Sequence, residues 1–443
     1  MKASAPARAP RRRLLVGTAV HNSHVQNMVK ALYETGALYA YFSGGVDVWH
    51  NAALRRVRQW VGSSVPHLGR ELSRRAVAGI PDTFVRARWR WELPRALAGR
   101  FNGSVRLEDW LWERGEHDLD RLCARAIGQA EVDGFFGVEH GSLRTIQAAR
   151  AAGKPAVVAF LSPHRAMRER WVDAEFIRHP ELGSPGRQYL DDLSETRDAR
   201  RDDEARLAEW IVSGSSFTTR SLVAAGFPLE KILTIPLGGP DPIPISALPT
   251  APPSTLRLVY VGPVSVRKGA HYLLRAWRQI AGPGLELHFY GKPLLPDHLI
   301  AEARASRGGD RLFFHGSVPA STLGAVYLNA SLLILPTLCD GFGQVISDAL
   351  AHGLPVVTTE NAGGADCVEP GVNGFVMPPA DSMAIAERLA WCADHPAALF
   401  DMRRPALARA ARWTWAHFRR QFAADVHGAL SAAGTDTRLR ALA

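Results

Sequence analysis

Two aspartates and two glycines stand together where an apolar segment gives way to a helix. The run 332–343, Leu-Leu-Ile-Leu-Pro-Thr-Leu-Cys-Asp-Gly-Phe-Gly, reads as a short strand and a turn, and a helix is predicted from there towards Gly353. Gly341 and Gly343 leave the backbone uncovered where the first helical N–H groups have no internal partner, so this helix start suits a phosphate or a sugar hydroxyl. Asp340 precedes the glycines and Asp348 follows about two helical turns later, so two carboxylates frame the turn.

A second set of candidate residues precedes this turn in the chain. Residues 256–262 are predicted to form a strand that ends at Gly262, and the helix after it is expected to include residues 272–277. Lys268 lies in the loop between them, where a lysine can reach a diphosphate held at the helix start, and Arg267 could add a second cation. We therefore expect these two cations and the turn 340–343 to close on one pyrophosphate.

Polar residues also follow three expected strands in the first half of the chain. They are His21 and Asn22 after the strand 13–20, Glu139 and His140 after the strand that begins near Val132, and His164 after the strand 155–161. Doubly wound α/β folds bind ligands just beyond the carboxyl ends of their strands, so His21, Asn22, Glu139 and His140 are candidates for the acceptor side of a site. His24 lies in the same first loop, where an acceptor or a phosphate would be met. Helix capping or ordinary loop polarity is the alternative for each of them.

The order of expected elements predicts an α/β fold of two domains. A chain of 443 residues is too long for a single core, and the strand–helix–strand opening is typical of a Rossmann-like, doubly wound domain. The expected divisions are a basic tail 1–12, a first domain 13–238 with an insertion 49–112, a proline-rich linker 239–253, a second domain 254–410, and a closing helix and tail 411–443 that cross back to the first domain.

Taken together, these segments resemble family 4 glycosyltransferases, retaining enzymes of the GT-B fold with two Rossmann-like domains facing across a cleft. In that family two glutamates flank a Gly-Phe-Gly turn, and here Asp340 and Asp348 stand at the two positions at the same spacing. The resemblance implies that Asp340 bonds the donor sugar and Asp348 the ribose. It also implies that Lys268 contacts the diphosphate and His164 faces the sugar. Gly262, Arg267, Phe342 and the two glycines complete the expected donor site, with Val318 near the base.

The activity that this resemblance implies is transfer of a hexosyl group from a nucleotide-diphospho-sugar. The acceptor is an unidentified glycan, lipid-linked or small molecule, and the displacement occurs on the front face without a protein nucleophile. Lys268, Arg267 and the dipole of the helix near Gly341 would stabilise the leaving diphosphate. The Asp-x-Asp sequence at Asp118 and Asp120 is interpreted as a surface feature, so we expect neither a metal nor a cofactor.

Three other functions stay open at this point. A nucleotide-sugar epimerase would use the same cleft without an acceptor surface, and a PLP-dependent phosphorylase would need a Schiff-base lysine. A non-catalytic sugar- or lipid-binding protein is favoured by two departures from the family pattern. Aspartates replace both glutamates, and Pro263 occupies a position where relatives carry an arginine.

The segment 49–112 stands apart by its composition. It contains twelve arginines against five acidic residues, which gives +7 of the chain's formal net charge of +10, and six of the twelve tryptophans. Basic helices with interfacial aromatics suit an anionic membrane surface, where each cation contributes on the order of 1 kcal/mol. Charge spread for solubility is the alternative. We find no helix-turn-helix, zinc-finger or RNP-type signature, so nucleic acid is not an expected partner.

Apolar runs and cysteines set the expected location. No apolar run approaches the ~18 residues of a membrane-spanning helix, and the basic N-terminal stretch leads into a short strand and not into a signal-peptide core. The four cysteines have no paired spacing, so neither a zinc knuckle nor a disulfide framework is expected. We therefore expect a cytoplasmic protein, with a peripheral position at the inner face of the membrane as the option that segment 49–112 adds.

Overall fold

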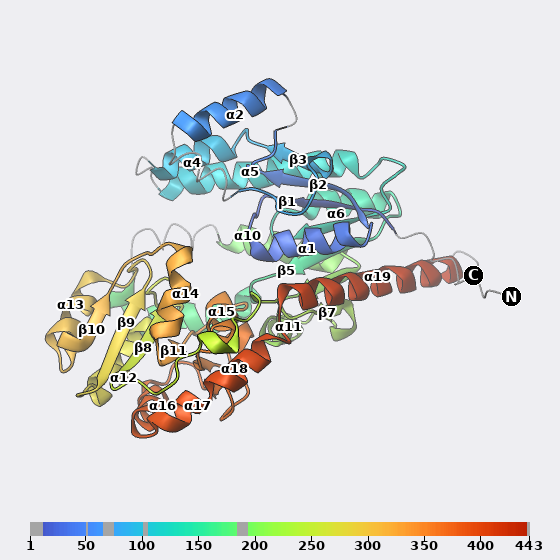
Figure 1. Ribbon diagram of the computed structural model, residues 1–443. Coiled ribbons are helices and arrows are strands. Elements are labelled where there is room, and N and C mark those ends of the chain that lie inside the picture. Colours follow the sequence, from blue (N-terminus) through green and yellow to red (C-terminus); the bar gives the residue numbers. More distant parts are fainter. Residues whose placement is uncertain (1–11, 50–51, 65–74, 101–104, 184–193, 441–443) are drawn as a thin grey trace.

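Two parallel β-sheets, each covered by helices, form the two halves of the molecule (Figure 1). The computed structural model describes residues 12–49, 52–64, 75–100, 105–183 and 194–440. The expected tail 1–12 lies almost wholly outside these residues. The fold class predicted from the sequence, α/β with two Rossmann-like domains, is confirmed.

The first half is built on a seven-stranded sheet in the order β3-β2-β1-β4-β5-β6-β7. Its strands are β1 (Leu14–Thr18), β2 (Leu38–Gly44), β3 (Val85–Arg88), β4 (Gly134–Val138), β5 (Ala156–Phe160), β6 (Trp210–Ser213) and β7 (Ile232–Thr234). Its main helices are α1 (Ser23–Glu34), α2 (Ala52–Ser64), α4 (Glu92–Arg100), α5 (Val105–Ala126), α6 (Leu143–Ala151), α10 (Ser194–Leu207) and α11 (Ser216–Ala224). Strands β1, β4 and β5 are buried along their whole length, as parallel strands covered on both faces must be.

The arginine-rich segment 49–112 contributes a strand as well as helices. The sequence predicted basic helices there, and α2, α4 and the start of α5 provide them, but β3 pairs in parallel with β2 at the edge of the sheet. The sequence did not predict this strand because arginines alternate with apolar residues in Val85–Arg88, and an edge strand tolerates charge on its exposed side. Several large apolar side chains of the segment are exposed, namely Trp60, Leu93, Leu97, Leu107 and Trp110.

The second half is built on a six-stranded parallel sheet in the order β10-β9-β8-β11-β12-β13. Its strands are β8 (Leu256–Val261), β9 (Leu285–Tyr290), β10 (Leu312–Phe314), β11 (Leu332–Leu335), β12 (Val356–Thr359) and β13 (Gly374–Met377). Its helices are α12 (Ala270–Ile280), α13 (Asp297–Ala305), α14 (Ala320–Asn329), α15 (Gln344–Ala351), α16 (Ser382–Asp394), α17 (Pro396–Asp401) and α18 (Arg403–Ala410).

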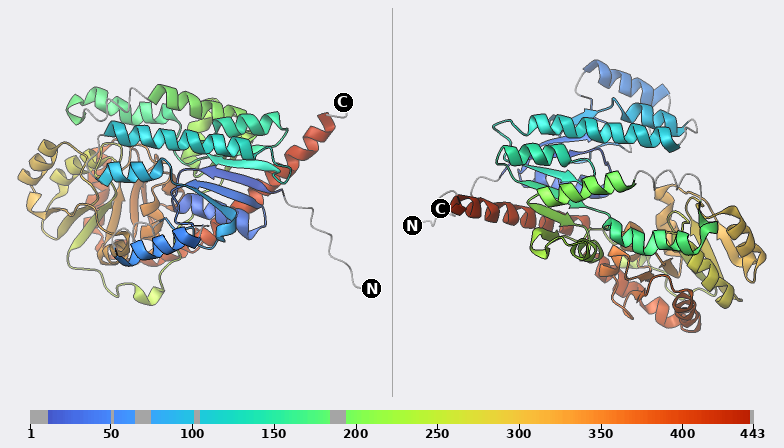
Figure 2. Two further views of the ribbon diagram at one scale, coloured as in Figure 1. Left: turned by 90° about the horizontal axis from the view of Figure 1, so that it is seen from above. Right: turned by 180° about the vertical axis from the view of Figure 1, so that it is seen from behind.

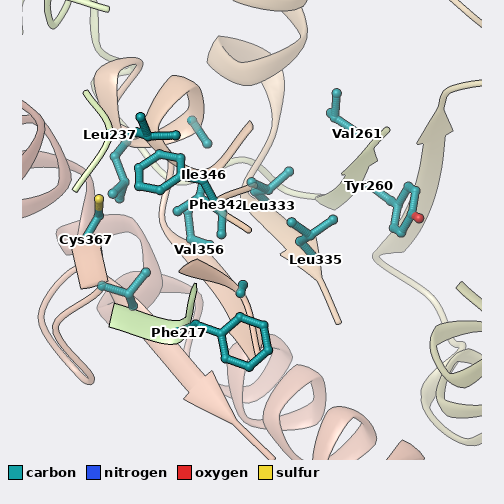
Figure 3. Close-up of a cluster of buried hydrophobic side chains, with 14 of the residues drawn as sticks. Phe217, Leu237, Tyr260, Val261, Leu333, Leu335, Phe342, Ile346, Val356 and Cys367 are labelled. Atoms are coloured by element: carbon teal, nitrogen blue, oxygen red, sulfur yellow. The ribbon is translucent and has the colours of Figure 1, made fainter. Parts of the chain in front are cut away.

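The core of the second half surrounds β11 and α15. Phe342, Leu333 and Ile346 pack together there, and Tyr260 lies at the β8 side of the same cluster (Figure 3). Phe342 is 3% exposed, and burying an aromatic side chain of this size contributes roughly 1.5–3 kcal/mol. This packing fixes the turn that precedes α15 on the edge of the sheet.

Two segments cross from one half of the molecule to the other. Helix α19 (Trp415–Arg440) runs back along α1 (Figures 1 and 2), and Arg419 bonds Glu34 across this contact at 3.0 Å. From the first half, α7 (Arg165–Arg168), a π-helical turn and α8 (Ala174–Arg178) reach α12. There the fully buried Glu175 carboxylate accepts hydrogen bonds from His271 and Tyr272. Each half therefore extends one segment onto the other half, and we call these segments, residues 165–178 and 415–440, the two arms.

Candidate active site

Three charged side chains meet at the exits of β8 and β11. The Lys268 ammonium forms an ion pair with Asp340, and the Arg267 Nη1 atom lies 3.8 Å from Asp340 Oδ1. Lys268 and Asp340 are 9% and 8% exposed, whereas the Arg267 side chain is 47% exposed. Seventy-two positions separate the lysine from the aspartate, so the structure brings these three predicted site residues together from two distant loops.

The backbone of both loops locks this cluster in place. Leu338 N and the Thr337 hydroxyl donate to the Arg267 carbonyl at 2.9 and 3.0 Å, and Asp340 N donates to Asn361 O at 3.0 Å. The cluster is therefore preorganised by main-chain bonds, and it does not depend on long flexible side chains alone.

The charges in this cluster perturb one another. Burial raises the pKa of Asp340, but the ammonium of Lys268 and the guanidinium of Arg267 outweigh burial and hold that pKa below its ordinary value. Burial lowers the pKa of Lys268, and the Asp340 carboxylate opposes that shift. Two cations against one carboxylate leave an excess of positive charge, and the half-exposed Arg267 presents that charge to solvent.

The turn 340–343 lies against the first half of the molecule. A side chain at Gly341 would overlap the carbonyl oxygen of Leu161, and the Gly341 carbonyl accepts a hydrogen bond from Ser215 Oγ at 2.7 Å. The sequence predicted that Gly341 leaves the helix start open to a ligand. In the structure it is instead the close approach of β5's exit loop that requires glycine here.

The other two residues of the Gly-Phe-Gly turn are also buried. Phe342 belongs to the core described above, so its side chain is not available to a donor, in contrast with the expectation. Gly343 caps α15 in the left-handed region at φ +80°, which favours glycine. The positive end of the α15 dipole still lies beside Asp340, because the Asp340 carboxylate approaches Gly343 and pairs with Lys268.

Asp348 lies on α15 without a described cationic partner. Burial raises its pKa to about 6, and a hydrogen bond from Gln344 opposes this shift. A partly buried carboxylate with no counter-ion is suited to neutral hydroxyl donors such as those of a ribose. The expected contact between Asp348 and a ribose stays a prediction.

Gly262 and Val318 mark two further strand exits at this edge. Gly262 follows β8 at φ +131°, and its carbonyl oxygen lies so close to Gly291 that a side chain at Gly291 would overlap it. Val318 follows β10 and is partly exposed. Gly262 and Val318 therefore lie at the same edge as Lys268, although no direct contact joins them to it.

His164 is placed differently from the expectation. Its Nε2 lies 2.9 Å from Asp202 Oδ1, and its Nδ1 accepts a hydrogen bond from Ala166 N at 3.2 Å as the cap of α7. Both ring nitrogens are thus engaged within the first half, and the side chain is 7% exposed. A contact with a donor sugar would require these bonds to break, so in this arrangement His164 positions the chain after β5.

The four acceptor-side candidates all line cavities at the carboxyl ends of β1 and β4. Asn22, Glu139 and His140 line one of about 430 Å³, and His21 lines another of about 190 Å³. Asn22 also caps α1 by accepting from Val25 N at 3.0 Å, so capping and a position at the cavity coexist. Glu139 accepts from Leu161 N and Ser162 N at 3.0 and 2.9 Å, which fixes the loop that meets Gly341.

The Asp-x-Asp sequence is buried, not superficial. Asp118 and Asp120 are 7% and 0% exposed, and the Asp120 carboxylate accepts from the main chain of Arg144 and Thr145 and from Arg200. The surface interpretation was wrong because these partners lie far along the chain. Among the described residues, no group of three His, Cys, Asp or Glu side chains is arranged to hold a metal ion.

Gln344 had no role in the sequence-based prediction, and His24 was expected to meet an acceptor or a phosphate and not to contact Gln344. His24 Nε2 lies 2.9 Å from Gln344 Oε1, which joins α1 of the first half to the start of α15. Gln344 Nε2 in turn donates to Gly238 O at 3.1 Å. Their positions directly after the strand-exit loops 21–23 and 340–343 were the available signal.

Comparison with known proteins finds a family model that matches most of the second half. Residues 255–395 match the family model "Glycosyl transferases group 1". Capsular polysaccharide biosynthesis glycosyltransferase CapM of Staphylococcus aureus is 31% identical over 140 residues, 29% of this chain and 34% of CapM. Glycogen synthase of Mycobacterium tuberculosis is 33% identical over 143 residues, 32% of this chain and 34% of the synthase. These alignments span only about a third of each curated relative.

The likeness of the whole fold extends further than the group 1 segment. The crystal structure of Anabaena Alr3699/HepE in complex with UDP has a TM-score of 0.58 at 16% identity, and the match covers 95% of this chain and all of that one. At this identity the likeness shows the fold alone, which is GT-B. Lys268, Asp340 and Asp348 lie inside the group 1 segment, whereas the acceptor-side candidates lie outside it.

Proposed function

We propose that this chain is a retaining glycosyltransferase of family 4. It transfers a hexosyl group from a nucleotide-diphospho-sugar to a glycan, lipid-linked or small-molecule acceptor. The observation that carries the proposal is the preorganised cluster of Lys268, Arg267 and Asp340 beside the positive end of α15. A group 1 match over 255–395 supports it.

The cluster suits a leaving diphosphate. Its excess positive charge and the helix dipole would stabilise the negative charge that develops as the bond between the anomeric carbon and the phosphate oxygen breaks. In a front-face displacement the new glycosidic bond forms on the same face, and the departing phosphate oxygen takes the proton of the acceptor hydroxyl. Asp340, held on Lys268, would then accept hydroxyl hydrogen bonds from the donor sugar, and Asp348 those of the ribose.

Relatives of the same fold support a nucleotide-sugar as the donor. The Anabaena protein has been crystallised with UDP and with UDP-glucose. A donor of this class, bound without a metal, fits a site whose countercharge comes from Lys268 and Arg267. We include no cofactor in the proposal.

The surface of segment 49–112 supports a peripheral place on the cytoplasmic face of a membrane. Trp60 and Trp110 are 65% and 46% exposed beside a strongly basic segment, a combination that suits anionic headgroups. None of the described helices combines the length and the apolar character that spanning a bilayer requires.

The test is nucleotide binding and turnover in three variants. We expect titration with UDP, ADP and GDP, free and as sugar conjugates, to find one nucleoside diphosphate that binds the wild type. Lys268→Ala should weaken this binding 10- to 100-fold, because a charge-assisted contact contributes about 1.5–3 kcal/mol. Asp340→Asn should abolish donor hydrolysis or transfer. Arg278→Ala is the matched control, since it removes a surface cation from α12, the helix that follows Lys268, and this cation is paired with Glu302 at 2.8 Å.

Two outcomes would contradict this proposal. If no nucleoside diphosphate binds the folded wild type, the site is not a donor site. If both site variants bind and turn over like the wild type, the charged cluster has no catalytic part. Retention is checked separately by NMR, because a product with the anomeric configuration opposite to that of the donor would exclude front-face displacement.

A further inference from the structure

Two cavities in the first half share a wall. The larger, about 430 Å³, and the smaller, about 190 Å³, are both lined by Val20 and Trp112. Trp112 stacks on His140 at 4.5 Å with an interplanar angle of 12°, and the guanidinium of Arg197 lies 5.3 Å from its ring centroid. Because these contacts hold the indole in place, both cavities are formed in advance of any ligand.

The larger cavity borders the site of the charged cluster. Leu161 and Ser162 line it, and the same two residues touch Gly341 of the turn 340–343. The smaller cavity is lined by the loop after β1 and, beyond it, by residues of β3, α4, α5 and their loops, including Arg88, Trp91 and Gly115. The two cavities therefore meet at Val20 and Trp112, with the larger beside the proposed transfer point and the smaller beside β3 and α4.

Residues that line each cavity carry buried nitrogens without a hydrogen-bond partner in the described part of the chain. Among them are His140 Nε2 in the larger cavity and Trp91 Nε1 in the smaller. His140 is 8% exposed and adopts φ +84°, a conformation that costs a non-glycine residue about 1 kcal/mol or more. Burial, followed by the charges of Arg200, Arg197 and Arg201, lowers its pKa to about 3, so the imidazole is neutral at physiological pH.

The charges that line the larger cavity are already matched. Arg201 bonds Glu139 and Asp198, Arg197 bonds Asp109 and Glu113, and Arg168 bonds Asp198. An anionic ligand would have to displace these carboxylates. Neutral hydroxyl groups, by contrast, can add hydrogen bonds to the ion pairs and to the free nitrogen of His140.

The smaller cavity combines apolar and polar walls. Leu111, Leu119 and Trp91 provide apolar surface, while Arg88 and Arg95 provide donors. A pyranose ring has an apolar face of C–H groups and a rim of hydroxyls, so it matches this combination.

We propose that the acceptor is a saccharide of at least two linked units. Its terminal unit occupies the larger cavity beside His140 and offers the hydroxyl that receives the sugar, and the next unit lies beyond Trp112 beside Trp91. This inference rests on the proposed transferase function, which decides that the unit in the larger cavity is the one that receives the sugar. The binding of a two-unit saccharide can nevertheless be measured without turnover.

The chain offers a matched pair of variants for the smaller cavity. Gly115 lies in α5 and lines that cavity, and a Cβ added there would meet only Trp91 Cβ, at 3.5 Å. Gly115→Ala therefore leaves the space nearly unchanged, whereas Gly115→Leu fills it. Both replace a helical glycine with a better helix former, so neither should impair folding.

Calorimetric titration of the full chain with a sugar panel provides the test. The panel is glucose, galactose and mannose with maltose, cellobiose, lactose and α-1,2-mannobiose. We expect at least one disaccharide to bind wild type and Gly115→Ala 10-fold or more tightly than its component monosaccharides. In Gly115→Leu this advantage should fall below 3-fold, while the nucleotide affinity stays unchanged.

Three results would overturn the inference. They are equal affinity for mono- and disaccharides in the wild type, an advantage that survives Gly115→Leu, and a panel in which nothing binds. Failure of the transferase proposal has a different signature, because nucleotide binding and donor hydrolysis would then be absent while the preference for a disaccharide persisted.

Discussion

Gly341→Ala is expected to push apart the two halves of the molecule where the turn 340–343 meets Leu161. The added methyl carbon would overlap the Leu161 carbonyl oxygen and would lie 3.0 Å from the carbonyl carbon. Both are backbone atoms, so no side-chain rotation can relieve the overlap. The Glu139 carboxylate also fixes this backbone by accepting hydrogen bonds from Leu161 N and Ser162 N. Since carbon contacts are favourable only near 3.5–4.0 Å, the turn must withdraw by on the order of 1 Å.

The loss of free energy follows from the contacts that this withdrawal breaks. The bond from Ser215 Oγ to the Gly341 carbonyl, 2.7 Å long, would pass beyond hydrogen-bonding distance, as would the weaker contact from Thr218 at 3.4 Å. Each neutral hydrogen bond contributes about 0.5–1.5 kcal/mol, and overpacking adds about 1–3 kcal/mol. We therefore expect the free energy of unfolding to fall by about 2–4 kcal/mol.

Urea denaturation measures this loss, and small-angle X-ray scattering measures the separation. Gly428→Ala in α19 is the matched control, because nothing lies within 4 Å of the added carbon and a helical alanine is favoured over glycine by about 1 kcal/mol. A Gly341→Ala protein with unchanged stability and an unchanged radius of gyration would refute the argument that glycine is required by the contact between halves.

Two further predictions concern charge. Because the pKa of Asp348 is raised to about 6, its ionisation between about pH 4 and pH 6 disfavours the folded state. Asp348→Asn should therefore raise the free energy of unfolding at pH 8 by up to about 2–3 kcal/mol and have little effect at pH 4; an equal effect at both pH values would contradict this. The protein should co-sediment with vesicles rich in anionic lipid at low salt, and it should not co-sediment with neutral vesicles. High salt and Trp60→Ala should each reduce the amount of protein bound. Binding that does not depend on lipid charge would exclude the proposed anionic membrane surface.

The elements around the candidate site could largely be predicted from the sequence. The expected strand, turn and helix of 332–353 appear as β11 and α15, and Lys268 and Asp340 lie together. Their expected contact with one pyrophosphate stays a prediction. These predictions succeeded because buried parallel strands are continuous apolar runs, and because the exits of such strands gather at one edge of a sheet.

The remaining features depend on partners that lie far away in the sequence. Asp120 can be buried because Arg200 and the main chain at the start of α6 donate hydrogen bonds to its carboxylate. The His164 ring is held in the first half because its Nε2 atom bonds the Asp202 carboxylate. Gly341 faces the backbone of the other half and not a ligand. A local pattern indicates which residues are polar or flexible, but it does not indicate which distant segment will be placed against them.

The exchanged arms have a consequence for protein engineering. A chimera that joins this second half to the first half of a relative would leave His271 and Tyr272 without the Glu175 acceptor, and α1 without α19. Recombination points placed only at the proline-rich connection 239–253 would therefore cut through two interlocked surfaces. Exchange of the second half between proteins of this fold calls for grafts that carry residues 165–178 and 415–440 with the halves they pack against.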